Sequence, residues 1–323
     1  MSFLPWQENQ WRQLQQALSA GRLPHALLLA GDEGLGKEAF ALAFSQFLLR
    51  GRPLPHAACG ECRSCRFFRA GNHPDFLKLE PEAPGKPIRI DAVREMARWS
   101  VLTSQEGERR VTVICPADGM NAAAANSLLK TLEEPVRGNH VLLVSSRAAV
   151  LPATVRSRCQ KVIFSPPTGP AVQHWLAEQA GDAPWDLLLR VARGAPMTAL
   201  SLARDGALEI RAKRFDEFRR LWKTSRDPLS VAAAWAETDT GQTLGWLASW
   251  LRDMVRLRFR TKVEGLENPD LAEALQVMGE QFDLRDLLEL QDRVQSGVTD
   301  WKRTNLNIRL QTEDLLIALL ENR

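Results

Sequence analysis

A glycine-rich segment between an apolar run and an amphipathic run constrains the fold more than any other feature of the sequence. Residues His25 to Ala30 form a short apolar stretch typical of a buried strand, and Lys37 to Arg50 carry apolar residues at helical spacing. Between them, GDEGLG allows successive backbone N–H groups to turn toward an anion, and the next helix adds its positive end. The order strand, loop, helix predicts a phosphate-binding loop in an α/β domain.

Four residues of this segment, which we call the phosphate loop (31–38), match the pattern G-x-x-x-x-G-K. They are Gly31, Gly34, Gly36 and Lys37, and the lysine of such loops reaches terminal phosphates as a point charge. The next position normally offers a Ser or Thr hydroxyl to Mg²⁺, whereas here it is Glu38, whose carboxylate would disturb a metal beside an anionic ligand. Two interpretations stay open: the loop binds ATP or ADP, or it is a strand-to-helix turn that holds no ligand.

Nucleotide hydrolysis by this class of protein also needs an Asp for Mg²⁺ and a Glu for water at the end of a later strand. The corresponding strand, predicted at 110–115, runs into Pro116 and Ala117 and reaches an acid only at Asp118. Because phosphoryl transfer depends on placement and charge, losing both acids removes most of the rate. We therefore expect no hydrolysis and no intrinsic enzymatic activity from the chain alone.

Further strand and helix signals alternate as far as residue 164. Apolar runs predict strands at 76–79, 140–145 and 161–164, and helical spacing predicts helices at 6–20, 91–100 and 121–134. Asp91 is the expected N-cap of the second of these helices. The alternation predicts right-handed crossovers and an α/β fold, a mainly parallel sheet with helices on both faces.

A Pro-rich joint, SPPTGP, follows at 165–170, and beyond it the strand signal disappears while helical patterns continue to the last residue. We therefore predict three domains: a phosphate-loop domain at 1–167, a small helical domain at 168–207 and a larger helical domain at 208–323. The chain has no basic flank followed by an apolar run at its start, and no apolar stretch near the about 20 residues that span a bilayer. We expect a cytoplasmic protein without a membrane partner.

Three of the five cysteines are crowded as Cys59-x₂-Cys62-x₂-Cys65, a spacing suited to tetrahedral Zn²⁺. His56 is the nearest candidate for the fourth ligand, and His73 is the alternative. Four protein ligands would leave no open position for a substrate, so the zinc would be structural. A reduced, metal-free loop remains the other interpretation.

Five short strings occur in order along the first half of the chain: RLPHALLLAG (22–31), CGECRSC (59–65), AGNHPDF (70–76), NSLLKTLEEP (126–135) and SRC (157–159). With them the chain resembles the delta-prime subunits of bacterial DNA polymerase III clamp loaders, a divergent branch of the AAA+ superfamily. The resemblance is densest over residues 1–165. It implies that the three predicted domains are an AAA+ module, a helical lid and a helical collar.

The resemblance also implies a role: a rigid, non-hydrolysing member of a hetero-pentameric ring with gamma/tau motor subunits and delta, which loads the sliding clamp onto primed DNA. Such a chain would be an accessory subunit of a DNA-directed DNA polymerase, a nucleotidyltransferase holoenzyme. The SRC arginine, Arg158 here, would reach the ATP of a neighbouring motor subunit as an arginine finger. Met197 stands where active relatives carry a lid arginine, Ser145 where they place a polar sensor, and Arg50 where the family has its fourth cysteine.

Two other functions are compatible with parts of this pattern. An active ATPase motor of the gamma/tau kind would share the LLKTLEEP and SRC strings, but residues 115–118 and Met197 argue against it. A zinc-stapled DNA-binding module would need a dense basic stripe. The net charge is only +3, and the arginines stand among acids, as in RDLLELQDR (285–293), which is typical of solvated helix faces.

Overall fold

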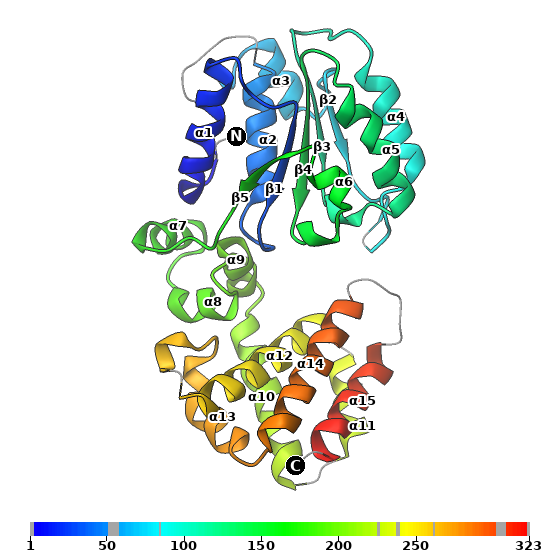
Figure 1. The fold of residues 1–323 in the computed structure, drawn as a ribbon. Helices are drawn as coiled ribbons and strands as arrows, with labels where there is room; N and C mark the ends of the chain where they lie inside the picture. The colour runs from blue at the N-terminus through cyan, green and yellow to red at the C-terminus, as the bar shows by residue number, and fades with distance from the viewer. Residues whose placement is uncertain are drawn as a thin grey trace. The chain divides into compact units, whose positions relative to one another are not determined.

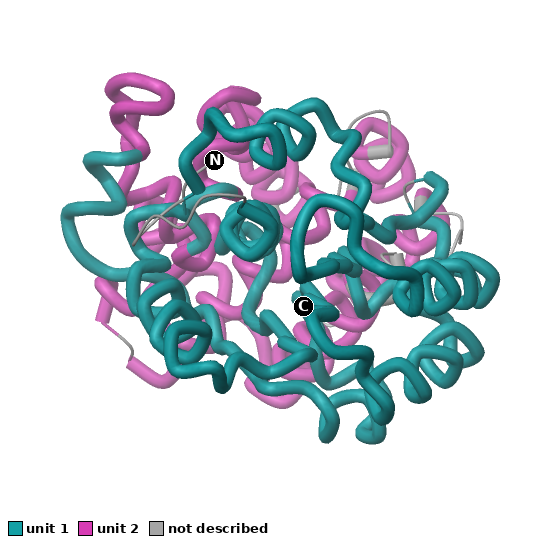
Figure 2. Tube along the Cα trace, turned by 90° about the horizontal axis from the view of Figure 1, so that it is seen from above, with its two compact units in different colours: residues 1–175, 195–197 teal, residues 176–194, 198–323 magenta. Residues whose placement is uncertain are grey.

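The computed structural model describes residues 3–50, 58–83, 85–224, 227–236, 240–260, 262–301 and 308–321. The chain divides into two compact units, coloured separately in Figure 2. Unit 1 comprises residues 1–175 and 195–197, and unit 2 comprises residues 176–194 and 198–323. The predicted domain boundaries after residues 167 and 207 stay predictions, because this division assigns parts of the 168–207 segment to both units.

Unit 1 is built on one five-stranded sheet in which every paired strand is parallel. The strands follow the order β2 (Phe76–Leu79), β3 (Arg110–Ile114), β4 (Asn139–Ser145), β1 (Ala26–Ala30) and β5 (Gln160–Ile163). All five residues of β1 are buried, as expected for the central part of a sheet covered on both faces. The predicted α/β class and its parallel sheet are confirmed.

Helices cover both faces of this sheet, and they begin and end near the predicted positions (Figure 1). One face carries α1 (Glu8–Ser19), α2 (Lys37–Leu48) and α3 (Arg63–Arg69); the other carries α4 (Ile90–Ser100), α5 (Ala122–Glu133) and α6 (Ala153–Arg156). Short 3-10 turns lie at Pro5–Gln7, Ala117–Gly119 and Ala148–Val150.

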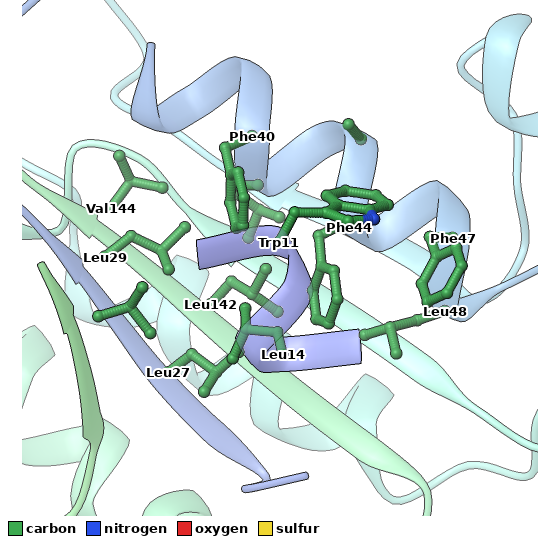
Figure 3. Packing of buried hydrophobic residues seen from close by; sticks show 14 of the residues in the cluster. Trp11, Leu14, Leu27, Leu29, Phe40, Phe44, Phe47, Leu48, Leu142 and Val144 are labelled. Carbon is green, nitrogen blue, oxygen red and sulfur yellow. The ribbon is translucent and has the colours of Figure 1, made fainter. Parts of the chain in front are cut away.

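Alternation along β1 divides its side chains between two apolar cores. Leu27 and Leu29 join the core on the α1–α2 face, while Leu28 joins the core on the α4–α5 face. On the first face Trp11 of α1 packs edge-on against the rings of α2, 5.6 Å from the ring of Phe44 (Figure 3). Aromatic pairs of this kind add about 0.5–1.5 kcal/mol beyond the area they bury.

The predicted N-cap of the second helix in this series is wrong. Helix α4 begins at Ile90 after Arg89, whose extended backbone makes it the N-cap, and Asp91 lies inside the first turn. Ile88 explains the shift, because it pairs with Met120 in a parallel bridge and so fixes the chain just before the helix. Asp91 still lies where a negative charge favours a helix N-terminus.

Unit 2 contains only helices and turns over its described residues. They are α7 (Pro170–Ala180, shared with unit 1), α8 (Trp185–Val191), α9 (Pro196–Arg204, shared with unit 1), α10 (Ala207–Thr224), α11 (Pro228–Ala236), α12 (Thr240–Arg258), α13 (Ala272–Gly279), α14 (Leu284–Trp301) and α15 (Ile308–Glu321), with 3-10 turns at Val263–Gly265 and Pro269–Leu271. Among the described helices, none is long and apolar enough to cross a membrane.

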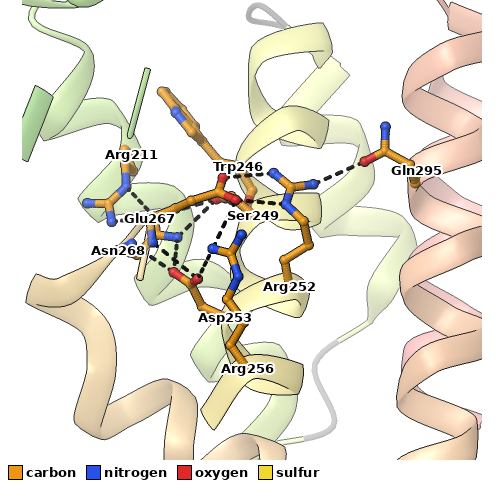
Figure 4. A network of polar contacts seen from close by, with 9 residues as sticks. All are labelled: Arg211, Trp246, Ser249, Arg252, Asp253, Arg256, Glu267, Asn268 and Gln295. Atoms are coloured by element: carbon orange, nitrogen blue, oxygen red, sulfur yellow. Dashed lines mark hydrogen bonds and ion pairs between the residues drawn. The ribbon is translucent and has the colours of Figure 1, made fainter. Parts of the chain in front are cut away.

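A buried polar network fixes how the helices of unit 2 meet (Figure 4). Asp253 of α12, fully buried, accepts hydrogen bonds from the backbone and side-chain nitrogens of Asn268 at 2.7 and 2.8 Å. Arg211 of α10 donates to the Asn268 side-chain oxygen at 2.7 Å, and Arg252 of α12 pairs with Glu267 at 2.9 Å. Because buried charges need such partners, the network specifies the packing of α10 and α12 against the 267–270 segment.

Candidate functional site

The phosphate loop leaves the carboxyl end of β1 and enters α2, as the sequence predicts. Gly34 and Gly36 adopt left-handed backbone angles, with φ of 78° and 79°, so the turn requires glycine at both positions. At Gly31 the requirement is steric: a Cβ there would lie 2.1 Å from the carbonyl oxygen of Phe164, just after β5. Two of the matching glycines thus shape the turn, and the third allows the β5 end to approach.

The carbonyl groups of the loop are bonded to the protein rather than to solvent. Leu35 O accepts from Trp6 Nε1 at 3.1 Å, Gly36 O accepts from Gln7 Nε2 at 2.9 Å, and Gly34 O accepts from the backbone N–H of Met197 at 2.9 Å. In a trans peptide the N–H points opposite to the C=O. The amides that follow these carbonyls therefore face away from the protein contacts, as an anion cradle requires.

Lys37 is held across the loop by the chain itself. Its side chain is 4% exposed, and Nζ donates to Asp32 O at 2.5 Å and to Ser146 Oγ at 3.1 Å. Burial lowers the pKa of Lys37 below its usual value, although nearby carboxylates oppose that shift. Ser146 thus contacts the loop lysine, whereas Ser145, in the polar sensor position suggested by the family, donates to Asp118 at 2.7 Å.

A lysine lies beside the position where a phosphate-loop enzyme holds its metal. Lys78 of β2 places Nζ 2.9 Å from Glu38 and 2.5 Å from Glu80, and these carboxylates raise its pKa despite its burial. Burial and the adjacent Glu38 carboxylate raise the pKa of the Cys115 thiol to about 12, so that thiol is neutral. An ammonium and a neutral thiol therefore accompany Glu38 in place of a metal-binding hydroxyl and acid.

The Asp118 carboxylate bonds residues at the end of β4 and in the turn that follows it, rather than residues of the phosphate loop. Its Oδ1 accepts from Ser145 Oγ at 2.7 Å and from the Ser146 N–H at 3.1 Å, and its Oδ2 pairs with Arg147 Nε at 3.2 Å. Burial by itself would raise the pKa of Asp118, but these hydrogen bonds outweigh it and lower the pKa. This carboxylate is thus held by three partners before any metal is considered.

The three cysteines of the cluster lie together at the start of α3. Their Sγ atoms are all within 4.8 Å of one another, and the Sγ atoms of Cys59 and Cys65 are 3.9 Å apart. A tetrahedron of sulfurs around zinc, with bonds of about 2.3 Å, has edges of about 3.8 Å, so the cluster fits such an ion. Burial and the neighbouring thiols raise the pKa of the Cys65 thiol to about 11. A cation would therefore be needed to hold the cluster as thiolates at neutral pH.

Of the two histidine candidates for the fourth zinc ligand, the structure describes His73. His56 lies outside the described residues. His73 is buried, with Nδ1 accepting from the Asp75 N–H at 3.1 Å and Nε2 facing Ser64 Oγ at 2.9 Å. Because the Ser64 hydroxyl donates to Leu49 O, His73 must be the donor of that bond. Both of its nitrogens are used, and His73 acts as a packing residue of the HPD string.

Arg50, at the end of the helix that precedes the cluster, stacks on Phe47, 3.5 Å from the ring centroid. Burial and the positive charge of Arg109 lower its pKa. Cys115 and Cys159 lie outside the cluster and are half-buried, as expected of packing residues.

Arg158 lies at the amino ends of the parallel strands, whereas the phosphate loop lies at their carboxyl ends. It precedes the amino end of β5, whereas the loop follows the carboxyl end of β1, and the two strands are parallel neighbours. Its guanidinium bonds Thr154 O at 2.9 Å and Glu133 Oε1 at 2.6 Å, and its side chain is 36% exposed. The arginine of the SRC string is therefore exposed at the end of the sheet that lies away from the chain's own phosphate loop.

Comparison with known proteins finds relatives that match most of the chain. The family model described as DNA polymerase III, delta subunit matches residues 6–168, and a second model, for the C-terminal part of the delta subunit, matches residues 205–321. DNA polymerase III subunit delta' of Pseudomonas aeruginosa is 36% identical over 97% of this chain and 96% of its own length. The Escherichia coli K12 protein of that name is 31% identical over 99% of this chain and 96% of its own. A solved gamma subunit-related protein of DNA polymerase III from Thermotoga maritima aligns over 97% of this chain and 99% of its own, at 19% identity and a TM-score of 0.46.

The parallel sheet, its glycine-lysine loop and the helical segments that follow define an α/β phosphate-loop protein with a helical C-terminal part. Within that class the chain belongs to the family of DNA polymerase III delta' subunits. The resemblance read from the five sequence strings is thereby confirmed.

Proposed function

We propose that this chain is a non-hydrolysing subunit of a DNA polymerase III clamp loader, in which it supports a ring of gamma/tau motor subunits and delta. In that ring it would help place the sliding clamp on primed DNA, and Arg158 would act as an arginine finger on the ATP of a neighbouring motor. Family membership supports the clamp-loader role. One observation supports the finger role: Arg158 lies at the amino ends of the strands, away from the chain's own phosphate loop at their carboxyl ends.

The distance between the two ends of the strands favours action of Arg158 on another chain. β5 spans Gln160–Ile163, so at about 3.3 Å per residue its amino and carboxyl ends are roughly 10 Å or more apart. Arg158 is also bonded to Thr154 and Glu133 at the amino end. A guanidinium that is exposed there meets an ATP phosphate only when a second subunit brings one.

The contacts around the phosphate loop support the absence of hydrolysis. Lys78 supplies a fixed positive charge between Glu38 and Glu80 beside the metal position, and Asp118 is bonded elsewhere. Neither arrangement offers the acid pair that positions Mg²⁺ and water. The amides of the loop and Lys37 still favour an anion, so bound ATP or ADP without turnover is consistent with this proposal.

The isolated chain is accordingly expected to turn over ATP no faster than its Lys37→Ala variant, since a loop that merely holds nucleotide gives no rate to lose. Steady-state ATPase assays with Mg²⁺ measure both proteins side by side. Turnover by the unmodified chain that disappears in Lys37→Ala would identify it as a motor, the alternative function, and would contradict the proposal.

We further propose that the cysteine cluster binds one structural zinc ion, with His56 as the fourth ligand. Purified protein is expected to carry about one zinc per chain and Cys62→Ser to lose it, because two sulfurs hold the ion far more weakly than three. Metal analysis of both, with Cys159→Ser as the control cysteine outside the cluster, tests the site. His56→Ala with unchanged zinc would exclude His56, and a zinc-free native protein would exclude the site.

A further inference from the structure

We propose that Glu133 is a positioning residue for Arg158, which it holds in the orientation needed for action on a neighbouring subunit. This inference rests on the proposed finger role of Arg158. Glu133 is the last residue of α5, and its Oε1 lies 2.6 Å from Arg158 NH2. Both side chains are partly exposed, at 48% and 36%, so this ion pair lies at the surface, within reach of a neighbouring chain.

The backbone that carries Arg158 is anchored on both sides. Val155 is fully buried against the α4–α5 core, and Cys159 packs against the same core from the other side of the arginine. The N–H of Arg158 donates to Val155 O at 3.2 Å. The Cα of Arg158 is therefore fixed, and only its long side chain has rotamers to lose when it meets a phosphate.

Two contacts remove that freedom while leaving donors available. NH1 donates to Thr154 O and NH2 donates to Glu133, which fixes the plane of the guanidinium at two points. Arginine has five N–H donors, and NH1 also lies 3.5 Å from Ser157 Oγ, so two donors remain for a ligand. A guanidinium ordered in advance loses less entropy on binding and reaches the phosphate in one orientation.

Helix stability does not account for an acid at this place. Glu133 and Glu134 both lie at the C-terminal end of α5, where the helix dipole disfavours negative charge. Arg158 offsets this for Glu133, whereas Glu134 forms no ion pair with any described residue, although its side chain is as near the helix end. Glu134 is therefore a matched control: same residue type, same helix end, no contact with Arg158.

The test uses the complete clamp loader reconstituted with this chain and with one hydrolysis-competent motor next to it, and measures kcat and KM for DNA-stimulated ATP hydrolysis. Glu133→Ala is expected to lower kcat by about 3- to 10-fold with KM for ATP unchanged, since the finger is still present but less ordered. Glu133→Gln keeps an acceptor oxygen and is expected to recover most of the rate. Glu134→Ala is expected to match the unmodified loader, and every variant is expected to assemble and melt like it.

A double-mutant cycle separates positioning from a general structural effect. In the Arg158→Ala background, Glu133→Ala is expected to lower kcat no further. An additional loss there, or a wild-type or higher rate in Glu133→Ala alone, would overturn the positioning role. If Arg158→Ala alone leaves the rate unchanged, the finger role itself fails, a result that differs from a failure confined to Glu133.

Discussion

Replacing Arg158 with alanine is expected to lower ATP turnover at the adjacent motor site by on the order of 10³-fold, the lower end of the effect of arginine fingers. The guanidinium would stabilise charge that develops on the transferring phosphate, so its loss should act on kcat more than on KM. A loader with one hydrolysis-competent motor next to this chain isolates that site. In a loader with several active motors, the same change would appear as a smaller fractional loss.

Two variants sharpen this test. Arg158→Lys keeps a positive charge but loses the planar fork of donors, so it should recover only a small part of the rate. Arg156→Ala removes another exposed arginine, two residues away, that forms no ion pair with the rest of the described chain; it should leave the rate unchanged. Equal losses in Arg156→Ala and Arg158→Ala would point to local unfolding, and no loss in either would exclude the finger.

The periodicity of the sequence predicted the strands and helices of unit 1 because those elements are local. The 25–50 segment contains its own strand, glycine turn and helix, and the structure places each within two residues of the prediction. The strand order β2-β3-β4-β1-β5 could not be predicted from the sequence, because the apolar pattern along one strand does not show which strand lies beside it.

Two of the site contacts that sequence reasoning missed are long-range. Lys78 meets Glu38 across about forty residues of chain, and its only local signal is a charged residue inside an otherwise apolar strand. The choice of Ser146 over Ser145 as the partner of Lys37 depends on which of two successive side chains faces the loop, and hence on the exact end of β4. His73 was a candidate metal ligand by residue type alone, and the structure shows hydrogen bonds at both of its ring nitrogens, which residue type does not predict.

Asp75 is expected to be the most sensitive single position for the stability of unit 1. Its side chain is fully buried, and its carboxylate accepts from the N–H groups of Gln105 and Glu106 at 2.8 to 3.0 Å. Arg110 lies beside it, 3% exposed, with Nε 3.4 Å from Oδ1. This distance gives an ion pair without a good hydrogen bond, since Arg110 Nε has no hydrogen-bond partner.

Asp75→Ala should therefore lower the free energy of unfolding by about 3–5 kcal/mol, because it leaves the Arg110 charge buried without a counter-ion and two N–H groups without an acceptor. For a unit of this size that corresponds to a fall in Tm of roughly 10 °C, measured by differential scanning calorimetry. Asp91→Ala, at an exposed carboxylate 3.6 Å from Arg94, should change Tm by no more than about 2 °C.

Asp75→Asn and a paired replacement divide the effect between its two causes. Asn keeps an acceptor for one loop amide but removes the counter-charge, so a loss close to that of Ala would assign the effect to the ion pair. Asp75→Leu with Arg110→Met removes both charges and should recover part of the stability lost in Asp75→Ala, since an apolar pair replaces an uncompensated charge. If the double variant is the least stable of the set, the hydrogen bonds that these two side chains make to the backbone dominate the stability. The Asp75 carboxylate accepts from the N–H groups of Gln105 and Glu106, and Arg110 NH1 and NH2 donate to the Trp99 and Thr103 carbonyls, each at 2.7 Å. The main role of Asp75 would then be to fix the 101–109 loop rather than to neutralise a buried charge.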